Sequence, residues 1–139
     1  MKTKILRGVE QPQIHEKILM SINPEFAKKI ISGEKKYEYR RVIPSKICNI
    51  KHIVIYETYP IQQVSAEIEV VGFCYGTPEM IWKQTYKNSG ITKEFFDKYC
   101  EGCNNIIAYK LGDIHLFDIP LTLQDYNLKF PPQSFVYLD

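Results

Sequence analysis

The pattern of hydrophobic and polar residues at the start of the chain predicts a strand followed by a helix. Residues 16–22, EKILMSI, are almost continuously apolar and indicate a strand that is buried on both faces. In the next segment, residues 23–33, apolar residues recur at helical spacing, so one stripe of this helix is expected to pack inward. Asn23 is suited to cap the helix, Pro24 to occupy its first position and Gly33 to end it. The stripe consists of Phe26, Ala27, Ile30 and Ile31.

Alternation with a period of two follows and predicts three further strands. The first lies in KKYEYRR, residues 35–41, and the other two are the β-branched segments 52–58 and 63–76. In the first of them, alternation separates two faces. One face carries Lys36, Glu38 and Arg40, and the other carries Tyr37, Tyr39 and Arg41.

The second half of the chain predicts two helices and then more strands. One helix is expected to open at Thr77, and another to run from Thr92 to near Gly102 with Phe95, Phe96 and Tyr99 on one face. Residues 105–112 and 114–119 predict a hairpin around Gly112-Asp113, ended by Pro120, and residues 131–138 predict a short closing strand. Six or seven strands with about three short helices indicate an α+β fold built on a small mixed or antiparallel barrel.

The length and composition favour one folded domain. At 139 residues, with 45% apolar and 24% charged residues, the chain can bury a core of its own. We expect a flexible arm at 1–14 and one domain at 15–139. No apolar run reaches the roughly 18 residues of a membrane span, and the start lacks an export signal, so a cytoplasmic protein without a membrane partner is predicted.

The four cysteines favour ordinary reduced thiols over a metal site. Cys100 and Cys103 have the CxxC spacing of half a zinc site, but Cys48 and Cys74 are distant in sequence and the histidines are scattered. No metal or other cofactor is therefore predicted. The chain also lacks a glycine-rich phosphate loop, which argues against ATP or dinucleotide binding.

Positive charge is concentrated in one segment. The net charge is only +2, yet residues 28–51 hold eight of the Lys and Arg residues and only two acids, Glu34 and Glu38. This asymmetry is typical of a basic face that attracts phosphate. A lysine-rich solvated surface would give the same pattern, and charge alone does not separate the two.

The sharpest pattern in the chain is G-x-K-x-x-E-x-R, from Gly33 to Arg40. Lys35 is expected at the turn after the helix, where its ammonium can reach across a cleft. Glu38 and Arg40 lie two positions apart on a strand, so their side chains point the same way, about 7 Å apart. Such a group can grip phosphate and accept a hydrogen bond from the amine of a base. A salt-bridged strand face is the simpler alternative.

This motif resembles the signature of the ASCH domain family, which consists of small PUA-like barrels. The preceding residues 21–35 also fit the family's S-I-x-P-x-x-A-x-x-I-x-x-G-x-K opening, and later segments resemble a prokaryotic and phage subgroup, so the resemblance covers about residues 16–138. It implies RNA binding linked to RNA processing or to the regulation of translation or transcription, with the motif lining a cleft. One branch of the family hydrolyses acetylated cytidine with a G-x-K-x-x-T-x-R motif. Here Lys35 matches its catalytic lysine, but Glu38 replaces its threonine.

Other polar and aromatic residues are weaker candidates for the same cleft. Tyr56, at the end of the strand 52–58, is the best candidate for stacking on a base, whereas Trp82 is expected to pack in the core. Gln133 and Ser134 lie in a loop before the last strand, where they either bind ligand or only shape a prolyl turn.

Two functions remain open on this sequence, and the chain is expected to be a monomer or a weak dimer in either case. In the first, the cleft binds RNA or a modified nucleotide. In the second, a small enzyme uses the same cleft as a ribonuclease or an acetylated-cytidine amidohydrolase, with Lys35 and Glu38 as catalytic residues. A role in protein interaction is a third hypothesis. The predicted binding residues are Lys35, Lys36, Glu38, Arg40, Arg41, Tyr56, Gln133 and Ser134.

Overall fold

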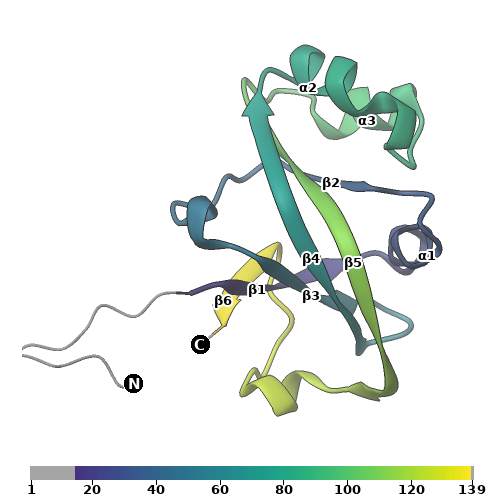
Figure 1. Ribbon diagram of the computed structural model, residues 1–139, viewed down its shortest axis with the longest axis vertical. Coiled ribbons are helices and arrows are strands. Elements are labelled where there is room, and N and C mark those ends of the chain that lie inside the picture. Colours follow the sequence, from purple (N-terminus) through teal and green to yellow (C-terminus); the bar gives the residue numbers. More distant parts are fainter. Residues whose placement is uncertain (1–14, 139) are drawn as a thin grey trace, which may run out of the picture.

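The structure is a computed structural model that describes residues 15–138. Within this range the chain forms a mixed six-stranded sheet of order β2-β5-β4-β3-β1-β6, in which only β1 and β3 are parallel. The sheet curls into a half-barrel that is open between β2 and β6 (Figure 1). The strands are β1 (Lys17–Ile22), β2 (Tyr37–Arg40), β3 (His52–Glu57), β4 (Gln63–Gly76), β5 (Ile106–Leu121) and β6 (Phe135–Leu138).

The three α-helices of the described residues begin where the capping residues predict, and the first also ends at its predicted glycine, whereas the third ends at Tyr99, before Gly102. The first, α1 (Pro24–Ser32), is capped by Asn23, whose side chain accepts a hydrogen bond from the Glu25 N–H, and Gly33 ends it in the left-handed conformation at φ 85°. Threonine hydroxyls cap α2 (Pro78–Thr85) and α3 (Lys93–Tyr99) in the same way. Short 3₁₀ helices occupy η1 (Ile47–Asn49), η2 (Tyr86–Asn88) and η3 (Leu123–Tyr126).

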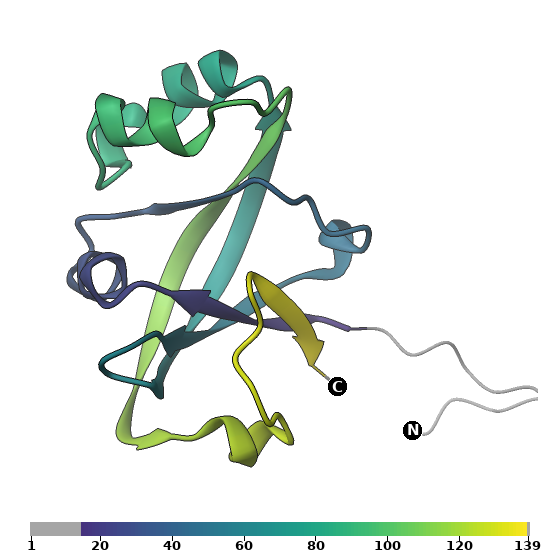
Figure 2. The ribbon, with the colours of Figure 1, turned by 180° about the vertical axis from the view of Figure 1, so that it is seen from behind.

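Both faces of the half-barrel are covered by apolar side chains. On β1, Ile18, Met20 and Ile22 belong to the main core, whereas Leu19 packs into a second cluster on the other face, as the continuous apolar run predicts. The helices α2 and α3 sit at one end of the long β4–β5 ribbon, and α1 lies beside β2 (Figures 1 and 2). A third cluster, which includes Tyr39 and Phe96, fills the space beneath α2 and α3.

The predicted hairpin around Gly112 and Asp113 is wrong, because residues 106–121 form the single strand β5. In its register with β4, Leu111 pairs with Val70 and Ile114 with Ile68. Gly112 and Asp113 therefore both lie opposite one residue, Glu69, and form a β-bulge rather than a turn. The long strand β4 offers pairing partners on both sides of the bulge, which outweighs the local turn preference. The strand also continues one residue beyond Pro120, its predicted end.

The predicted arm at residues 1–14 falls outside the described residues. Within the described part of the chain, no helix is both long and apolar enough to cross a membrane.

Candidate functional site

The G-x-K-x-x-E-x-R motif connects α1 to the edge strand β2. The left-handed turn at Gly33 sends the chain back so that the Lys35 N–H donates to the Lys29 carbonyl at 3.0 Å. Lys36 then joins the sheet region, because its carbonyl accepts from the Leu111 N–H at 3.0 Å. The motif thus enters the fold at the junction of α1, β2 and β5, which places Lys35 between layers rather than on the surface.

Lys35, Glu38 and Arg40 form a nearly buried ionic triad. Arg40 Nε donates to the carboxylate oxygen Glu38 Oε2 at 2.9 Å, and Arg40 Nη2 forms an ion pair with the same oxygen at 2.7 Å. On the other side of the carboxylate, Lys35 Nζ lies 3.8 Å from Glu38 Oε1. Arg40 is anchored further by the Ser21 carbonyl, which accepts from Nη2 at 2.7 Å. Glu38 and Arg40 are salt-bridged, but Lys35 and Glu38 are only 3% and 7% exposed, so the charged groups are nearly buried rather than solvated.

The Lys35 ammonium is held by a carbonyl and two aromatic rings. It donates to the Ser89 carbonyl at 2.9 Å and lies 4.8 and 5.7 Å from the ring centroids of Tyr39 and Phe26. Burial lowers the pKa of Lys35 from its ordinary value of 10.5, the Glu38 carboxylate opposes this shift, and the charges of Arg40 and Lys29 add to it. Lys35 is therefore easier to deprotonate than a surface lysine.

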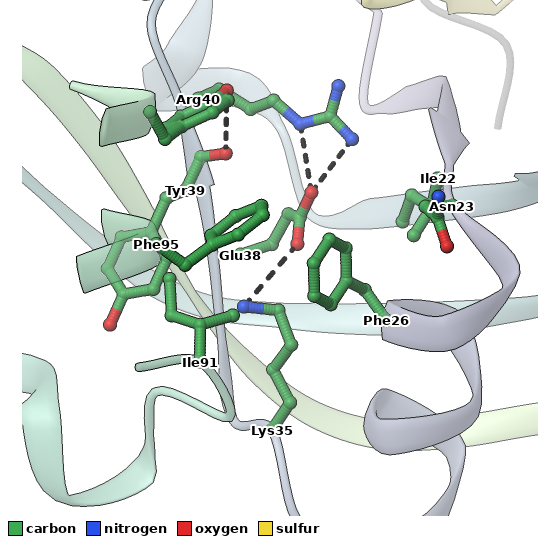
Figure 3. A pocket seen from close by; sticks show the side chains of 10 residues that line it. Ile22, Asn23, Phe26, Lys35, Glu38, Tyr39, Arg40, Ile91 and Phe95 are labelled. Carbon is green, nitrogen blue, oxygen red and sulfur yellow. Dashed lines mark hydrogen bonds and ion pairs between the residues drawn. The ribbon is translucent and has the colours of Figure 1, made fainter. Parts of the chain in front are cut away.

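The triad lines a cavity of about 170 Å³ that has aromatic walls. The Phe26 ring from α1 and the Phe95 ring from α3 meet edge to face, with centroids 5.2 Å apart, and both lie beside the charged groups (Figure 3). Tyr99 contributes a third ring, and its hydroxyl donates to the Tyr39 carbonyl at 3.2 Å. The complete lining comprises Ile22, Asn23, Phe26, Lys35, Glu38, Tyr39, Arg40, Ile91, Phe95 and Tyr99.

Known proteins are similar in sequence to most of this chain, although no protein-family model matches it. An ASCH domain-containing ribonuclease from Zymomonas mobilis is 31% identical over 124 residues, which is 86% of this chain and 82% of that protein. The chain belongs to the ASCH domain family. This agrees with the resemblance carried by the motif from Gly33 to Arg40.

Structural comparison supports the same assignment. A crystal structure of a serine-to-alanine variant of the Zymomonas mobilis ASCH protein superposes with a TM-score of 0.81 at 27% identity, covering 91% of this chain and 90% of that one. The predicted PUA-like α+β fold is thereby confirmed. Large ribosomal subunit protein uL22 of Ureaplasma parvum is 26% identical over 130 residues, and this ASCH chain spans 41% of its length.

None of the other predicted site residues lines the cavity itself. Ser134 approaches the triad, since Arg40 Nη1 lies 3.5 Å from its hydroxyl. Arg41 is exposed and stacks over the Tyr99 ring at 4.8 Å, whereas Lys36 and Gln133 are exposed without lining the cavity.

Tyr56 lies apart from the triad. It borders a separate groove of about 550 Å³ beside η3. Its residue is 4% exposed, which leaves little ring surface for stacking on a base.

Sequence reasoning missed the aromatic walls of the cavity. Phe26 was assigned to the packing stripe of α1, and Phe95, Phe96 and Tyr99 to one face of α3. In the structure Phe96 is buried in the core, but Phe95 is 45% exposed and lines the cavity with Tyr99. The four-residue spacing of Phe95 and Tyr99 places both rings on one side of the helix, and this was the available signal.

None of the four cysteines lines the cavity. Cys100 is buried at the end of α3, and its carbonyl accepts a hydrogen bond from the Cys103 N–H at 2.9 Å. Burial raises the pKa of Cys100 to about 11, which keeps this group a thiol near neutral pH. Across residues 15–138, no group of three or more His, Cys, Asp or Glu residues is placed to hold a metal ion.

Proposed function

We propose that this ASCH domain binds RNA and holds one nucleotide in the cavity of the ionic triad. The observation that carries the proposal is the combination, in one cavity, of aromatic walls with buried cations. Bases stack on aromatic side chains at about 1–3 kcal/mol each, whatever their sequence. The rings of Phe26, Phe95 and Tyr99 offer such surfaces beside the charged groups.

The charge of the cavity favours an anionic group such as phosphate. Lys35 and Arg40 carry two positive charges against the single negative charge of Glu38. Among residues 15–138, Arg40 Nη1 has only a long contact, 3.5 Å to the Ser134 hydroxyl, so we take this donor to be available to a ligand. A guanidinium nitrogen donates a charge-assisted hydrogen bond to a phosphate oxygen, so Nη1 can hold one such oxygen while Nε and Nη2 stay with Glu38 and Ser21. Arg41, exposed beside Tyr99, adds positive charge close to the cavity wall.

RNA cleavage is the second candidate function, and the position of Glu38 favours it. Its carboxylate is the acceptor that a ribose 2′-hydroxyl needs in order to lose its proton. Glu38 would take the 2′-proton, the 2′-oxygen would bond to phosphorus, and the bond from phosphorus to the 5′-oxygen would break. A water molecule would then carry the proton from Glu38 to the 5′-oxygen, which restores the carboxylate. Arg40 and Lys35 would stabilise the charge that develops on the phosphate. The name of the Zymomonas mobilis relative, an ASCH domain-containing ribonuclease, supports this reaction.

Binding and cleavage are separable with three variants. Single-stranded RNA labelled at one end is incubated with wild type, Arg40→Gln, Glu38→Gln and the control Lys83→Gln, which changes an exposed lysine on α2. We expect RNA binding to weaken at least tenfold in Arg40→Gln and to be unchanged in the control. RNA binding absent from wild type even at low salt would refute the proposal.

Product analysis decides the second candidate. A product ending in a 2′,3′-cyclic phosphate, formed by wild type and lost in Glu38→Gln, establishes cleavage at this site. If wild type binds RNA but leaves it uncleaved, the domain is an RNA-binding module without ribonuclease activity. Acetylated cytidine is tested as a further substrate in the same assay. Lys35 matches the catalytic lysine of the amidohydrolase motif, whereas Glu38 replaces its threonine, so only an assay decides whether this activity is present. If RNA and nucleoside both fail, a role in protein interaction becomes the leading hypothesis.

A further inference from the structure

The segment 88–91, which runs from the last residue of η2 toward α3, lies against the motif lysine; we call it the linker. Three hydrogen bonds join the two regions although about 50 residues of sequence separate them. The Lys36 N–H donates to the Asn88 carbonyl at 2.9 Å, and Lys35 Nζ donates to the Ser89 carbonyl at 2.9 Å. Lys29 Nζ donates to the Gly90 carbonyl at 3.0 Å. The linker is thus bound to both sides of the motif turn.

Gly90 allows the linker to lie directly against the Lys35 side chain. Its φ is +70°, a conformation that residues with a Cβ rarely adopt. A Cβ at this position would lie 2.5 Å from Lys35 Cβ, 2.8 Å from its Cγ and 3.0 Å from its Cα. Two of these three atoms belong to the rigid start of the lysine, which cannot move without the motif turn.

The linker also has a defined shape of its own. The Ser89 hydroxyl donates to the Ile91 carbonyl at 3.0 Å and accepts from the Ile91 N–H at 3.4 Å. Ser89 is buried, and these two contacts orient its carbonyl toward the Lys35 ammonium. Ile91 continues into the cavity lining, so the linker connects the position of Lys35 with the shape of the cavity.

We propose that Gly90 is a positioning residue that fixes the Lys35 ammonium opposite Glu38. The linker contacts the lysine along its stem and at its tip, while the rings of Phe26 and Tyr39 lie beside the ammonium. A lysine side chain has many rotamers. Packing that restricts it to a single rotamer holds the ammonium in place before a ligand binds. The effect on RNA rests on the proposed function, whereas the effect on Lys35 does not.

Gly90→Ala tests the proposal, with Gly102→Ala as its matched control. Gly102 has a similar φ of +81°, but a Cβ there meets nothing within 4 Å. Both variants therefore place a Cβ at a left-handed φ, and only Gly90→Ala brings that Cβ against Lys35. The readout is the NMR signal of the lysine Cε, assigned with a Lys35→Met variant and followed as a function of pH. RNA binding and cleavage are measured on the same samples.

In Gly90→Ala we expect Lys35 to titrate closer to its ordinary pKa of 10.5, because the displaced ammonium is less buried. In Gly102→Ala we expect the titration of the wild type. RNA binding or cleavage should fall by up to about 100-fold in Gly90→Ala, because displacing a side chain of a site by about 1 Å can have an effect of this size. If Lys35 titrates identically in the two variants, Gly90 does not position it and the proposal is wrong.

If Gly90→Ala does not fold, a second variant that adds no atoms tests the same proposal. Ser89→Ala removes the hydroxyl that shapes the linker, and we expect a smaller shift of the Lys35 titration in the same direction. An unchanged titration would then overturn the proposal. If Lys35 responds but wild type neither binds nor cleaves RNA, the positioning role stands and the proposed function fails.

Discussion

Glu38→Gln is the substitution that most directly tests the energetics of the ionic triad. Glutamine has nearly the shape of glutamate, so the cavity keeps its packing while the charge disappears. Arg40 and Lys35 then face each other in a nearly buried region without their shared counter-charge. The substitution therefore isolates the electrostatic contribution of one carboxylate.

The magnitude follows from the contacts of Glu38. One hydrogen bond at 2.9 Å and one ion-pair contact at 2.7 Å join Arg40 to its carboxylate, and a hydrogen bond between charged groups contributes about 1.5–3 kcal/mol. Removing one partner of a buried ion pair costs about 3–5 kcal/mol. Arg40 keeps the Ser21 carbonyl as a partner, so we expect the lower end, about 3 kcal/mol of unfolding free energy. For a chain of this length that corresponds to a melting temperature lower by about 10 °C.

The assay is urea unfolding and thermal melting, with Glu34→Gln as the control. Glu34 lies four residues earlier, its side chain is 63% exposed and its carboxylate is 4.0 Å from Lys29 Nζ. An exposed pair of this kind contributes little, so the control should change the unfolding free energy by less than about 0.5 kcal/mol. If Glu38→Gln lies within about 1 kcal/mol of the control, the triad does not stabilise the fold as argued.

Three further predictions concern pH, buried hydroxyls and salt. Burial lowers the pKa of Lys35 in the folded protein, so between this lowered value and 10.5 the unfolded chain binds one proton more than the folded one. The unfolding free energy of the wild type should therefore rise with pH through that window. The urea midpoints of Lys35→Met should lack this rise. Tyr39→Phe should cost about 1 kcal/mol in urea unfolding, because the hydroxyl donates a 2.7 Å hydrogen bond to a buried threonine. Tyr109→Phe should cost less than about 0.5 kcal/mol, since the Tyr109 hydroxyl has no hydrogen-bond partner among residues 15–138, and equal losses in the two variants would contradict this reasoning. Arg41→Gln should lower the slope of log affinity against log salt for single-stranded RNA by about 0.7, whereas an unchanged slope would exclude Arg41 from phosphate contact.

Local signals in the sequence predicted the elements around the motif well. Asn23, Gly33 and the cap threonines mark helix ends because they satisfy or redirect backbone groups within a few residues. The apolar run at residues 16–22 likewise predicts a strand buried on both faces, which is what β1 becomes. Such features depend on neighbours in the chain, so they can be predicted without the fold.

The pairing of β4 with β5 could not be predicted from local signals. Gly112-Asp113 has the composition of a hairpin turn, and considered alone it predicts one. The register with β4 makes it a bulge, because continuing the pairing satisfies more backbone groups than turning would. Nothing within a few residues of Gly112 carries that information.

The sequence by itself determined which charged groups belong together in the motif. A spacing of two on a strand places Glu38 and Arg40 on one face, and the turn at Gly33 brings Lys35 close to them. Only the tertiary structure decided that these charges are buried and that aromatic rings surround them. Phe95 comes from α3 and the Ser89 carbonyl from the linker, both more than 50 residues away. Burial and the pKa of Lys35 depend on such distant atoms, because desolvation is set by everything packed around a charge rather than by its sequence neighbours.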